Sequence, residues 1–371
     1  MTGAQVFGMG DEPTAVPTWP ALTEDEIVRA IAATWGGPGP AEIEWRSARP
    51  LSSTVGVRLT DGARVVVKRL PVRLRDPAAL AEEHRFMAHL RTRGNPVPEV
   101  RAAVGDRDAG GEMCCGPARF VYEVQRAGVG EDRYRADFSW SPYRDTRDAA
   151  GAGAMLARLH VAAQGFDAPA RPARPLVAGL HGDSAVSAFE WQLARRPALA
   201  RFLADRDWRA EIPDLRVDLT GVTPLWTHGD WHPTNLLWDG AEVTTVFDFG
   251  LADRTTAVFD LATAVERTAV DWVSLRDGGA AHVREDQVGA LFAGYRSVRP
   301  LDRAEQAALA DLLPLVHLGY ELSEIDYFLA VAGQPRNAEI AYQDWLLGHL
   351  AWFRTPTGHS LRALVRDAAA G

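Results

Sequence analysis

Alternating apolar positions predict a small β-sheet in the first third of the chain. Residues 55–59 alternate in this way up to Asp61-Gly62, a dipeptide typical of tight hairpin turns, and the apolar run that follows supplies the returning strand. A two-residue turn at this point pairs Val55 with Lys68. Residues 120–124 are rich in β-branched and aromatic side chains and predict a further strand.

A helix with an acidic residue on its apolar face follows the hairpin. Asp76-Pro77 is a typical helix start, and the periodic pattern continues to Thr92. Glu83 shares the stripe formed by the apolar residues of this helix. A carboxylate on a buried face requires a positive partner, and Lys68 is the natural candidate. A solvated charge at the margin of the stripe is the alternative.

From about residue 145 onward the pattern is mainly helical, with one short β region at 225–248. The chain therefore predicts an α+β protein with three parts. These are a loosely packed tail at 1–20, a sheet-based lobe at 21–125 that also holds a capped helix at 24–35, and a larger helical lobe at 126–371. Helices of the larger lobe are expected at 147–164, 184–205, 256–275, 284–297, 302–331 and 338–353.

Composition and charge narrow the range of partners and cellular locations that we expect for this protein. The formal net charge of -9 argues against a general nucleic-acid partner. No apolar stretch reaches roughly 18 residues and no basic segment precedes an apolar run at the N-terminus, so neither a membrane span nor a signal peptide is expected. Cys114 and Cys115 are adjacent, and adjacent cysteines rarely form an unstrained disulfide. We therefore expect a cytoplasmic monomer or homodimer that acts on a small molecule.

Lys68 stands out by its chemistry. Among the 40 lysines and arginines it is the single lysine. A coding bias toward arginine explains the other positions, so the surviving lysine indicates a place where a compact ammonium is needed and a planar guanidinium does not fit. A tight phosphate contact is such a place. Chance survival at a surface position is the alternative.

A second hairpin carries further candidate chemistry. Asp239-Gly240 is again a tight turn, and counting back from it pairs Asn235 with Val246. Asp248 then lies two residues past that partner, roughly 7 Å along the strand at about 3.3 Å per residue. An amide oxygen and a carboxylate are hard ligands that suit Mg²⁺. Asp230 precedes Asn235 on the same loop and could face an incoming hydroxyl group.

Phosphoryl transfer requires neutralised phosphates, an in-line hydroxyl group and an acceptor for its proton. The sequence offers Lys68 for the α- and β-phosphates, Asp230 for the proton, and Asn235 with Asp248 for Mg²⁺. The remaining candidates contact the nucleotide or support Lys68. They are Glu83, which orients Lys68, the phosphate-covering backbone at Ser52, Ser53 and Thr54, and the hinge strand at Tyr122 and Val124, whose geometry decides between ATP and GTP.

His228-Gly229-Asp230 with Asn235, followed by Asp248-Phe249-Gly250, resembles the motifs of the aminoglycoside phosphotransferase and choline kinase family. The resemblance extends over most of the chain. It implies a protein-kinase-like bilobal fold, with a small N-terminal β-sheet lobe holding one helix and a larger, mainly helical C-terminal lobe. It also implies ATP or GTP with Mg²⁺ as cofactors, and Asp260 as a structural brace. The loop at 51–56 lacks the GxGxxG of protein kinases, which leaves its phosphate contacts open.

His228 and His232 have a second interpretation, because imidazole groups also bind zinc. A metallohydrolase would use them as ligands, but it would leave Lys68, Asn235 and Asp248 without a role. We therefore expect His228 to hydrogen-bond the backbone and shape the loop, and His232 to pack beneath it. A catalytically silent nucleotide-binding protein is the other alternative, and the complete set of motif residues argues against it.

Acidic residues near the C-terminal helices are candidates for binding the acceptor. Glu321, Glu324 and Asp326 cluster beside Tyr327, and such carboxylates bind ammonium groups. An ordinary solvated helix face is the alternative. We expect a hydroxylated antibiotic, such as an aminoglycoside or another natural product, because arginine-rich coding suggests an antibiotic-producing bacterium, in which phosphorylation would confer resistance. A metabolic alcohol such as homoserine, choline or a thiosugar is the alternative acceptor.

Overall fold

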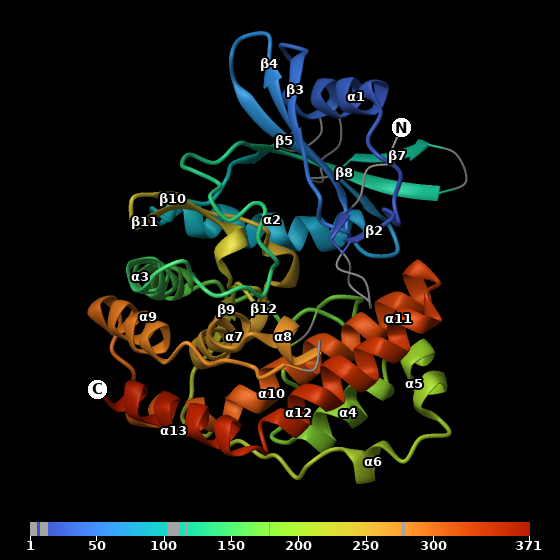
Figure 1. Ribbon diagram of the computed structural model, residues 1–371. Helices are drawn as coiled ribbons and strands as arrows, with labels where there is room; N and C mark the ends of the chain where they lie inside the picture. Colours follow the sequence, from blue (N-terminus) through green and yellow to red (C-terminus); the bar gives the residue numbers. More distant parts are fainter. Residues whose placement is uncertain (1–5, 8–13, 102–110, 116–117, 178, 277–278) are drawn as a thin grey trace. The chain divides into compact units, whose positions relative to one another are not determined.

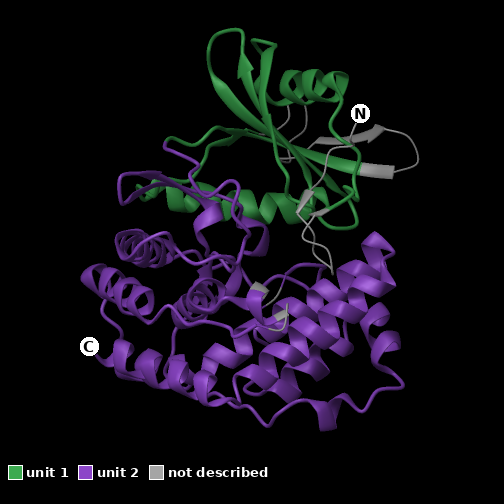
Figure 2. Cartoon of the chain, viewed as in Figure 1, with its two compact units in different colours: residues 1–129 green, residues 130–371 purple. Residues whose placement is uncertain are grey.

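The computed structural model describes residues 6–7, 14–101, 111–115, 118–177, 179–276 and 279–371. The chain divides into two compact units, unit 1 at 1–129 and unit 2 at 130–371 (Figure 2). The boundary falls at residue 129 rather than at the predicted 125, because the strand of unit 1 nearest to it continues to Arg126 before the chain leaves the sheet.

Unit 1 is built on one antiparallel sheet (Figure 1). Its strands run in the order β3-β4-β5-β8-β6, and β7 also pairs with β8. The strands are β3 (Pro40–Arg46), β4 (Ser53–Leu59), β5 (Arg64–Pro71), β6 (Val100–Arg101), β7 (Gly111–Cys115) and β8 (Ala118–Arg126). Helices α1 (Glu24–Trp35) and α2 (Pro77–Thr92) accompany the sheet, and both agree with the predicted spans.

Helix α1 packs on one face of this sheet. It begins with the predicted capping box, in which the Thr23 hydroxyl accepts from the Glu26 amide and the Glu26 carboxylate accepts from the Thr23 amide. Glu123 points to the other face, where its carboxylate lies 2.9 Å from Nε2 of His84 on α2. The core beneath α1 consists of alternate, buried residues of three strands, namely Val55, Val57, Leu59, Val65, Val67, Tyr122 and Val124.

The first hairpin is shifted by one residue from the prediction. Lys68 pairs with Thr54 and not with the next residue along the strand. The turn is the cause, because the Leu59 amide donates to the Ala63 carbonyl at 2.7 Å and the loop therefore has three residues instead of two. Gly62 ends this loop at φ +85°, the left-handed conformation typical of three-residue hairpin loops. A one-residue shift changes which side chains share a face with Lys68.

Unit 2 is mainly helical (Figure 1). Two short antiparallel strand pairs interrupt the helices. Strand β9 (Pro224–Thr227) pairs with β12 (Asp253–Thr256), and β10 (Leu236–Asp239) forms a hairpin with β11 (Glu242–Val246). The helices are α3 (Thr146–Ala163), α4 (Ala185–Leu193), α5 (Pro197–Leu203), α6 (Trp208–Glu211), α7 (Ala257–Ala269), α8 (Trp272–Arg276), α9 (Glu285–Val298), α10 (Arg303–Tyr327), α11 (Pro335–Ile340), α12 (Gly348–Trp352) and α13 (Pro356–Ala370).

Several predicted helices of unit 2 are divided in the structure. The span 184–205 is two helices because Pro197 cannot continue the first and begins the second. The span 302–331 ends in a π-helical segment, η3 (Phe328–Ala332), and the span 338–353 contains another, η4 (Ala341–Leu347). Helix α13 lies outside the predicted spans. None of the helices within the described ranges is long and apolar enough to cross a bilayer.

The described part of the segment 1–20 is more ordered than predicted. Strand β1 (Val6–Phe7) pairs with β2 (Thr14–Ala15). Trp19 packs against the core beneath α1, with its ring edge-on to Phe120 at a centroid distance of 6.2 Å. A large aromatic side chain that finds such a partner anchors the segment that carries it.

Candidate active site

The loop between β9 and β10 is shaped by a glycine that no other residue can replace without strain. Gly229 has φ +77°, a conformation that L-residues rarely adopt. A Cβ atom at this position would also lie 2.4 Å from the Leu251 carbonyl oxygen, which is backbone and cannot move aside. The tight approach sets the direction in which the next residue, Asp230, leaves the loop.

Asp260 on α7 anchors this loop through hydrogen bonds to its backbone. Its side chain is fully buried, and its two carboxylate oxygens accept hydrogen bonds from the backbone amides of His228 (2.9 Å) and Gly229 (2.8 Å). His160 approaches the same carboxylate at 3.1 Å, and its other ring nitrogen lies 2.7 Å from the Tyr295 hydroxyl. Burial alone would raise the pKa of Asp260, but these donors lower it, so the carboxylate is ionised. This is the geometry expected of a structural brace.

The His228 ring forms hydrogen bonds with backbone atoms through both of its nitrogens. Nε2 lies 2.9 Å from the Phe247 carbonyl and donates to it, while Nδ1 accepts from the Asp230 amide at 3.2 Å. His232 is also buried and contacts Thr234 and Asn235. No zinc-like grouping of these two histidines occurs among the described residues.

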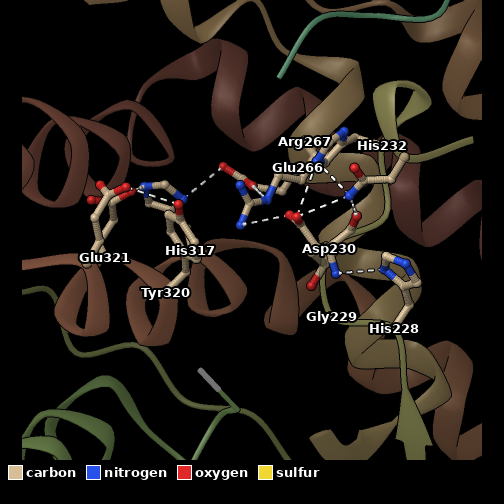
Figure 3. Close-up of polar contacts among 12 residues, drawn as sticks. His228, Gly229, Asp230, His232, Glu266, Arg267, His317, Tyr320 and Glu321 are labelled. Carbon is tan, nitrogen blue, oxygen red and sulfur yellow. Dashed lines mark hydrogen bonds and ion pairs between the residues drawn. The ribbon is translucent and has the colours of Figure 1, made fainter. Parts of the chain in front are cut away.

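Asp230 lies among polar groups that favour its charged form (Figure 3). Oδ2 is 3.3 Å from Nε2 of His232 and accepts from Nδ2 of Asn235 at 3.2 Å, while Oδ1 is 3.8 Å from the Arg267 guanidinium. Burial would raise the pKa of Asp230, but attraction to His232 and Arg267 outweighs it and holds the pKa well below the ordinary value. The side chain is 19% exposed, so an ionised carboxylate remains accessible at this point.

Asn235 and Asp248 are brought together by the second hairpin, although not in the predicted register. A bulge between Leu237 and Trp238 shifts the pairing of the two strands by one residue. As a result Asn235 lies opposite Phe247, whose backbone amide donates to the Asn235 carbonyl at 3.1 Å. Asp248 therefore follows directly after the partner of Asn235 instead of two residues after it. The predicted pairing of Asn235 with Val246 is wrong for this reason.

Asp248 adopts a conformation that has a cost. Its φ of +61° and ψ of +68° place a non-glycine residue in the left-handed region. Such a conformation costs of the order of 1–3 kcal/mol and persists at positions where it serves function. The Asn235 amide nitrogen is occupied by the Asp230 carbonyl at 3.0 Å, which leaves the Asn235 oxygen available as a ligand. An amide oxygen and a carboxylate together fit the hard-ligand preference of Mg²⁺.

Unit 1 carries the candidates for phosphate binding. Lys68 on β5 lies between Thr54 of β4 and Glu123 of β8 in the pairing register, so these three residues share the face that looks toward α2. Glu83 on α2 is buried and accepts a hydrogen bond from Nε of Arg75 at 2.8 Å. The positive partner that its burial requires is therefore supplied at least by Arg75. The pairing of Glu83 with Lys68 stays a prediction.

The other nucleotide candidates of unit 1 separate into two groups. The Ser52 hydroxyl lies 2.9 Å from that of Thr54, on the Lys68 face. The Ser53 hydroxyl instead accepts from the Leu22 amide at 3.0 Å, on the α1 side. Tyr122 donates to Glu26 at 2.7 Å, and Val124 lies in the same core.

The assignment of Tyr122 and Val124 as hinge contacts to the nucleotide stays a prediction. Their side chains point away from the Lys68 face because successive residues of a strand alternate. Their backbones pair on both sides, with β5 and with β7 or β6.

The acidic residues of α10 are buried, so the alternative of a solvated helix face is wrong. The exposed fractions of Glu321, Glu324 and Asp326 are 0%, 4% and 6%. Asp326 is neutralised by Arg196 at 3.3 Å and lies beside the buried Tyr327. Glu324 instead accepts from the Tyr320 hydroxyl at 3.0 Å, and burial raises its pKa to about 7 although that hydrogen bond lowers it.

Arg267 and Tyr320 are site residues that sequence reasoning missed. Arg267 on α7 is 2% exposed, contacts Asp230, and lies over the Tyr320 ring at 4.3 Å and the Trp140 ring at 4.8 Å. Through Tyr320 the polar contacts continue to Glu324. One signal was available: Arg267 lies seven residues after Asp260 on a helix rich in apolar residues, and a buried arginine requires a partner.

Comparison with known proteins gives a consistent result. The profile of the phosphotransferase enzyme family matches residues 48–301. A homoserine kinase of Methylobacillus flagellatus is 29% identical over 270 residues, which cover 71% of this chain and 74% of the relative. A homoserine kinase of Janthinobacterium sp. is 32% identical over 202 residues, which cover 52% of this chain and 55% of the relative.

Among solved structures, an amicoumacin kinase in complex with AMP-PNP and Ca²⁺ superposes with a TM-score of 0.56 at 15% identity. The alignment covers 87% of this chain and 94% of that chain. Similarity at this level of identity establishes a shared fold.

Proposed function

The chain belongs to the phosphotransferase enzyme family, and we propose that it moves the γ-phosphate of ATP or GTP onto a hydroxyl group of a small molecule. The protein-kinase-like fold, with a sheet-based unit 1 and a mainly helical unit 2, agrees with this membership. The observation that supports the reaction best is the loop of unit 2. Within it a braced, ionised and partly exposed carboxylate, Asp230, lies beside Asn235, and Asp248 follows directly after the residue that pairs with Asn235.

Asp230 is the proposed proton acceptor. Its ionised state and its exposure allow it to orient a hydroxyl group and take its proton as the oxygen attacks the phosphate. A carboxylate with a low pKa is a weak base. A weak base is nevertheless sufficient here, because in a loose transition state the hydroxyl group loses its proton late. Arg267 and the brace at Asp260 act through Asp230 and are positioning residues.

Asn235 and Asp248 are the proposed ligands of Mg²⁺, which neutralises phosphate charge when it is bound. In unit 1, Lys68 is the proposed contact of the α- and β-phosphates, with Ser52 and Thr54 on the same face. Glu83 is the proposed support of Lys68 through the charge network that already includes Arg75.

We propose a small amino alcohol as the acceptor, with homoserine as the first to test. The relatives that match most of the chain are homoserine kinases, whereas nothing in the structure specifically favours an antibiotic. Glu324 is buried, forms no ion pair with the residues that the structure describes, and connects through Tyr320 and Arg267 to Asp230. An ammonium group of a substrate would restore its ionised form, and Arg267 suits a substrate carboxylate.

An acceptor screen tests this proposal. Purified protein with ATP or GTP and Mg²⁺ is offered homoserine, choline, a thiosugar and a panel of aminoglycosides, and the nucleotide diphosphate and the phosphorylated product are measured by mass. We expect homoserine to be phosphorylated and Asp230→Asn to lose about 10²–10⁴ of kcat while it keeps its affinity for the nucleotide. Nucleotide binding without transfer to any acceptor would instead identify a silent nucleotide-binding protein.

The amino-alcohol assignment has a separate test. Glu324→Gln should raise KM for the amino alcohol at least tenfold and leave KM for the nucleotide unchanged. Asp326→Asn is the matched control, because the Asp326 carboxylate is already paired with Arg196. Equal effects of both substitutions on the acceptor KM would contradict the role of Glu324.

A further inference from the structure

Three helices of unit 2 bring one carboxylate and two imidazoles together in a group that does not include the proposed Mg²⁺ ligands. Glu266 lies on α7, His317 on α10 and His349 on α12. One ligand atom from each lies within 4.8 Å of the others, and no other such group is found among the residues that the structure describes. Their exposed fractions are 1%, 3% and 2%. The proposed phosphotransfer reaction assigns none of the three a role.

The polar atoms of this cluster are close together but lack hydrogen bonds. Nδ1 of His317 and Nδ1 of His349 each lie 3.3 Å from Oε1 of Glu266. Nevertheless Oε1 of Glu266 and both nitrogens of each ring lack a partner with hydrogen-bond geometry. Unsatisfied buried polar atoms are costly and rare, so several in one place require an explanation.

A bound metal ion explains why Oε1 of Glu266 and Nδ1 of each ring lie close together without hydrogen-bond geometry. Ligand atoms held at roughly 2.0–2.1 Å by one tetrahedral zinc ion lie about 3.3 Å from one another. The two distances to Glu266 match this separation. Two nitrogens and one carboxylate oxygen also form a ligand set typical of zinc with an open fourth position for water.

The surroundings hold the two rings in place. His349 is stacked on Trp272 with centroids 3.7 Å apart, and His317 is stacked on His349 at 4.0 Å. On its far side Nε2 of His317 lies 3.2 Å from Oε1 of Glu321, so that the ring lies between the carboxylates of Glu266 and Glu321 (Figure 3). A carboxylate behind the ligating histidine is a common arrangement in metal sites, because it orients the ring and increases its basicity.

Charge and access also agree with a cation. Glu266 places a carboxylate in a buried space where Arg267 is a neighbouring cation, at 3.8 Å from the second oxygen of Glu266. Arg267 is in turn shared with Asp230. A cavity of about 410 Å³ reaches His349 between α8, η4 and α12 and offers a route for an ion.

We propose that Glu266, His317 and His349 bind one divalent transition-metal ion, with Zn²⁺ as the expected metal, and that the ion ties α7, α10 and α12 together. The nitrogen ligands distinguish this site from the all-oxygen Mg²⁺ site proposed for Asn235 and Asp248. The inference does not rest on the proposed phosphotransfer, because its readouts are metal content, a spectrum and thermal stability.

The experiment uses the full chain, purified without a histidine tag and stripped of metal with a chelator. We expect it to take up one Zn²⁺ per chain by elemental analysis after dialysis, and to show a rise in Tm. With Co²⁺ it should show the visible absorption of a tetrahedral ion. His317→Gln should lose both signals. His359→Gln is the matched control, because His359 lies exposed on α13, and it should retain them.

A second variant keeps the test decisive if His317→Gln fails to fold. His349→Cys should retain the metal and add a thiolate-to-Co²⁺ charge-transfer band, which only a ligand at that position can produce. Absence of Zn²⁺ from the wild-type chain, retention of one equivalent by His317→Gln, or absence of the new band in metal-loaded His349→Cys would each overturn the proposal. An unchanged metal content in Asp230→Asn would show that the site stands apart from the proposed reaction.

Discussion

Replacement of Asp260 by asparagine tests whether the catalytic loop depends on its brace. The Asp260 carboxylate accepts from the amides of His228 and Gly229 and contacts His160. An asparagine has one acceptor oxygen, so at least one of these buried donors faces an NH₂ group and loses its partner. A buried unsatisfied donor costs about 1–3 kcal/mol, and the loss of a charged acceptor places the change near the upper end, at about 3 kcal/mol.

Two consequences follow from this magnitude. At roughly 2–4 °C per kcal/mol for a unit of this size, the Tm of unit 2 should fall by roughly 6–12 °C. A loop whose backbone is no longer held should also misplace Asp230, and a displacement of about 1 Å costs on the order of 10² in rate. We therefore expect Asp260→Asn to lower kcat about 100-fold, with KM for the nucleotide almost unchanged because the proposed phosphate contacts of unit 1 are not altered.

The assay measures nucleotide diphosphate release with the best acceptor of the screen, at a temperature where the variant is folded by circular dichroism. Asp148→Asn is the matched control. Asp148 is a buried carboxylate of unit 2 bonded by Arg133 and Tyr134, and its side chain does not touch the loop at 228–235. It should lose stability and keep kcat within a few-fold. If folded Asp260→Asn turns over at the wild-type rate, or if both variants lose kcat equally, the brace interpretation is refuted.

Three further predictions concern other parts of the chain. Lys68→Arg keeps the charge but replaces a compact ammonium by a planar fork, so kcat/KM for the nucleotide should fall at least tenfold in steady-state assays; unchanged kinetics would argue for chance survival of the lysine. Gly229→Ala brings a Cβ to 2.4 Å from the Leu251 carbonyl at φ +77°, so the Tm should fall by several degrees and kcat with it, and a fully active, stable variant would refute the tight approach. Burial would raise the pKa of Glu26, but the Thr23 amide and the Tyr122 and Arg69 side chains lower it to about 2, so it contributes stability that is present above about pH 4.5 and lost as the pH falls toward 2. Glu26→Gln should remove this part of the acid sensitivity of unit 1 in urea unfolding at pH 3–7, and an unchanged pH profile would contradict the assignment.

Local signals in the sequence predicted the elements that depend on neighbouring residues. The capping box at Thr23, the helix start at Asp76 and the turn at Asp239-Gly240 all involve contacts within a few positions of one another. Such contacts form wherever the local chain allows them. For the same reason the motif residues around Asp230 could be recognised as a set, since they lie on one loop.

Register was the first feature that local signals did not determine. A third loop residue in the hairpin ended by Gly62, and a bulge after Leu237, each moved the pairing by one position. The burial of the Tyr122 and Val124 side chains also depends on distant packing, because α1 covers their face of the strand and α1 comes from another part of the chain.

The sequence by itself determined the family and indicated Lys68, Asp230, Asn235 and Asp248 as candidate site residues, because short motifs and hydrophobic periods are written in neighbouring positions. Only the tertiary structure decided the partners of buried charges, such as Arg75 for Glu83 and Arg267 for Asp230, and the meeting of Glu266, His317 and His349. The physical reason is that a buried charge must find its counterpart across packed elements, and spacing along the chain carries no information about which distant helix supplies it.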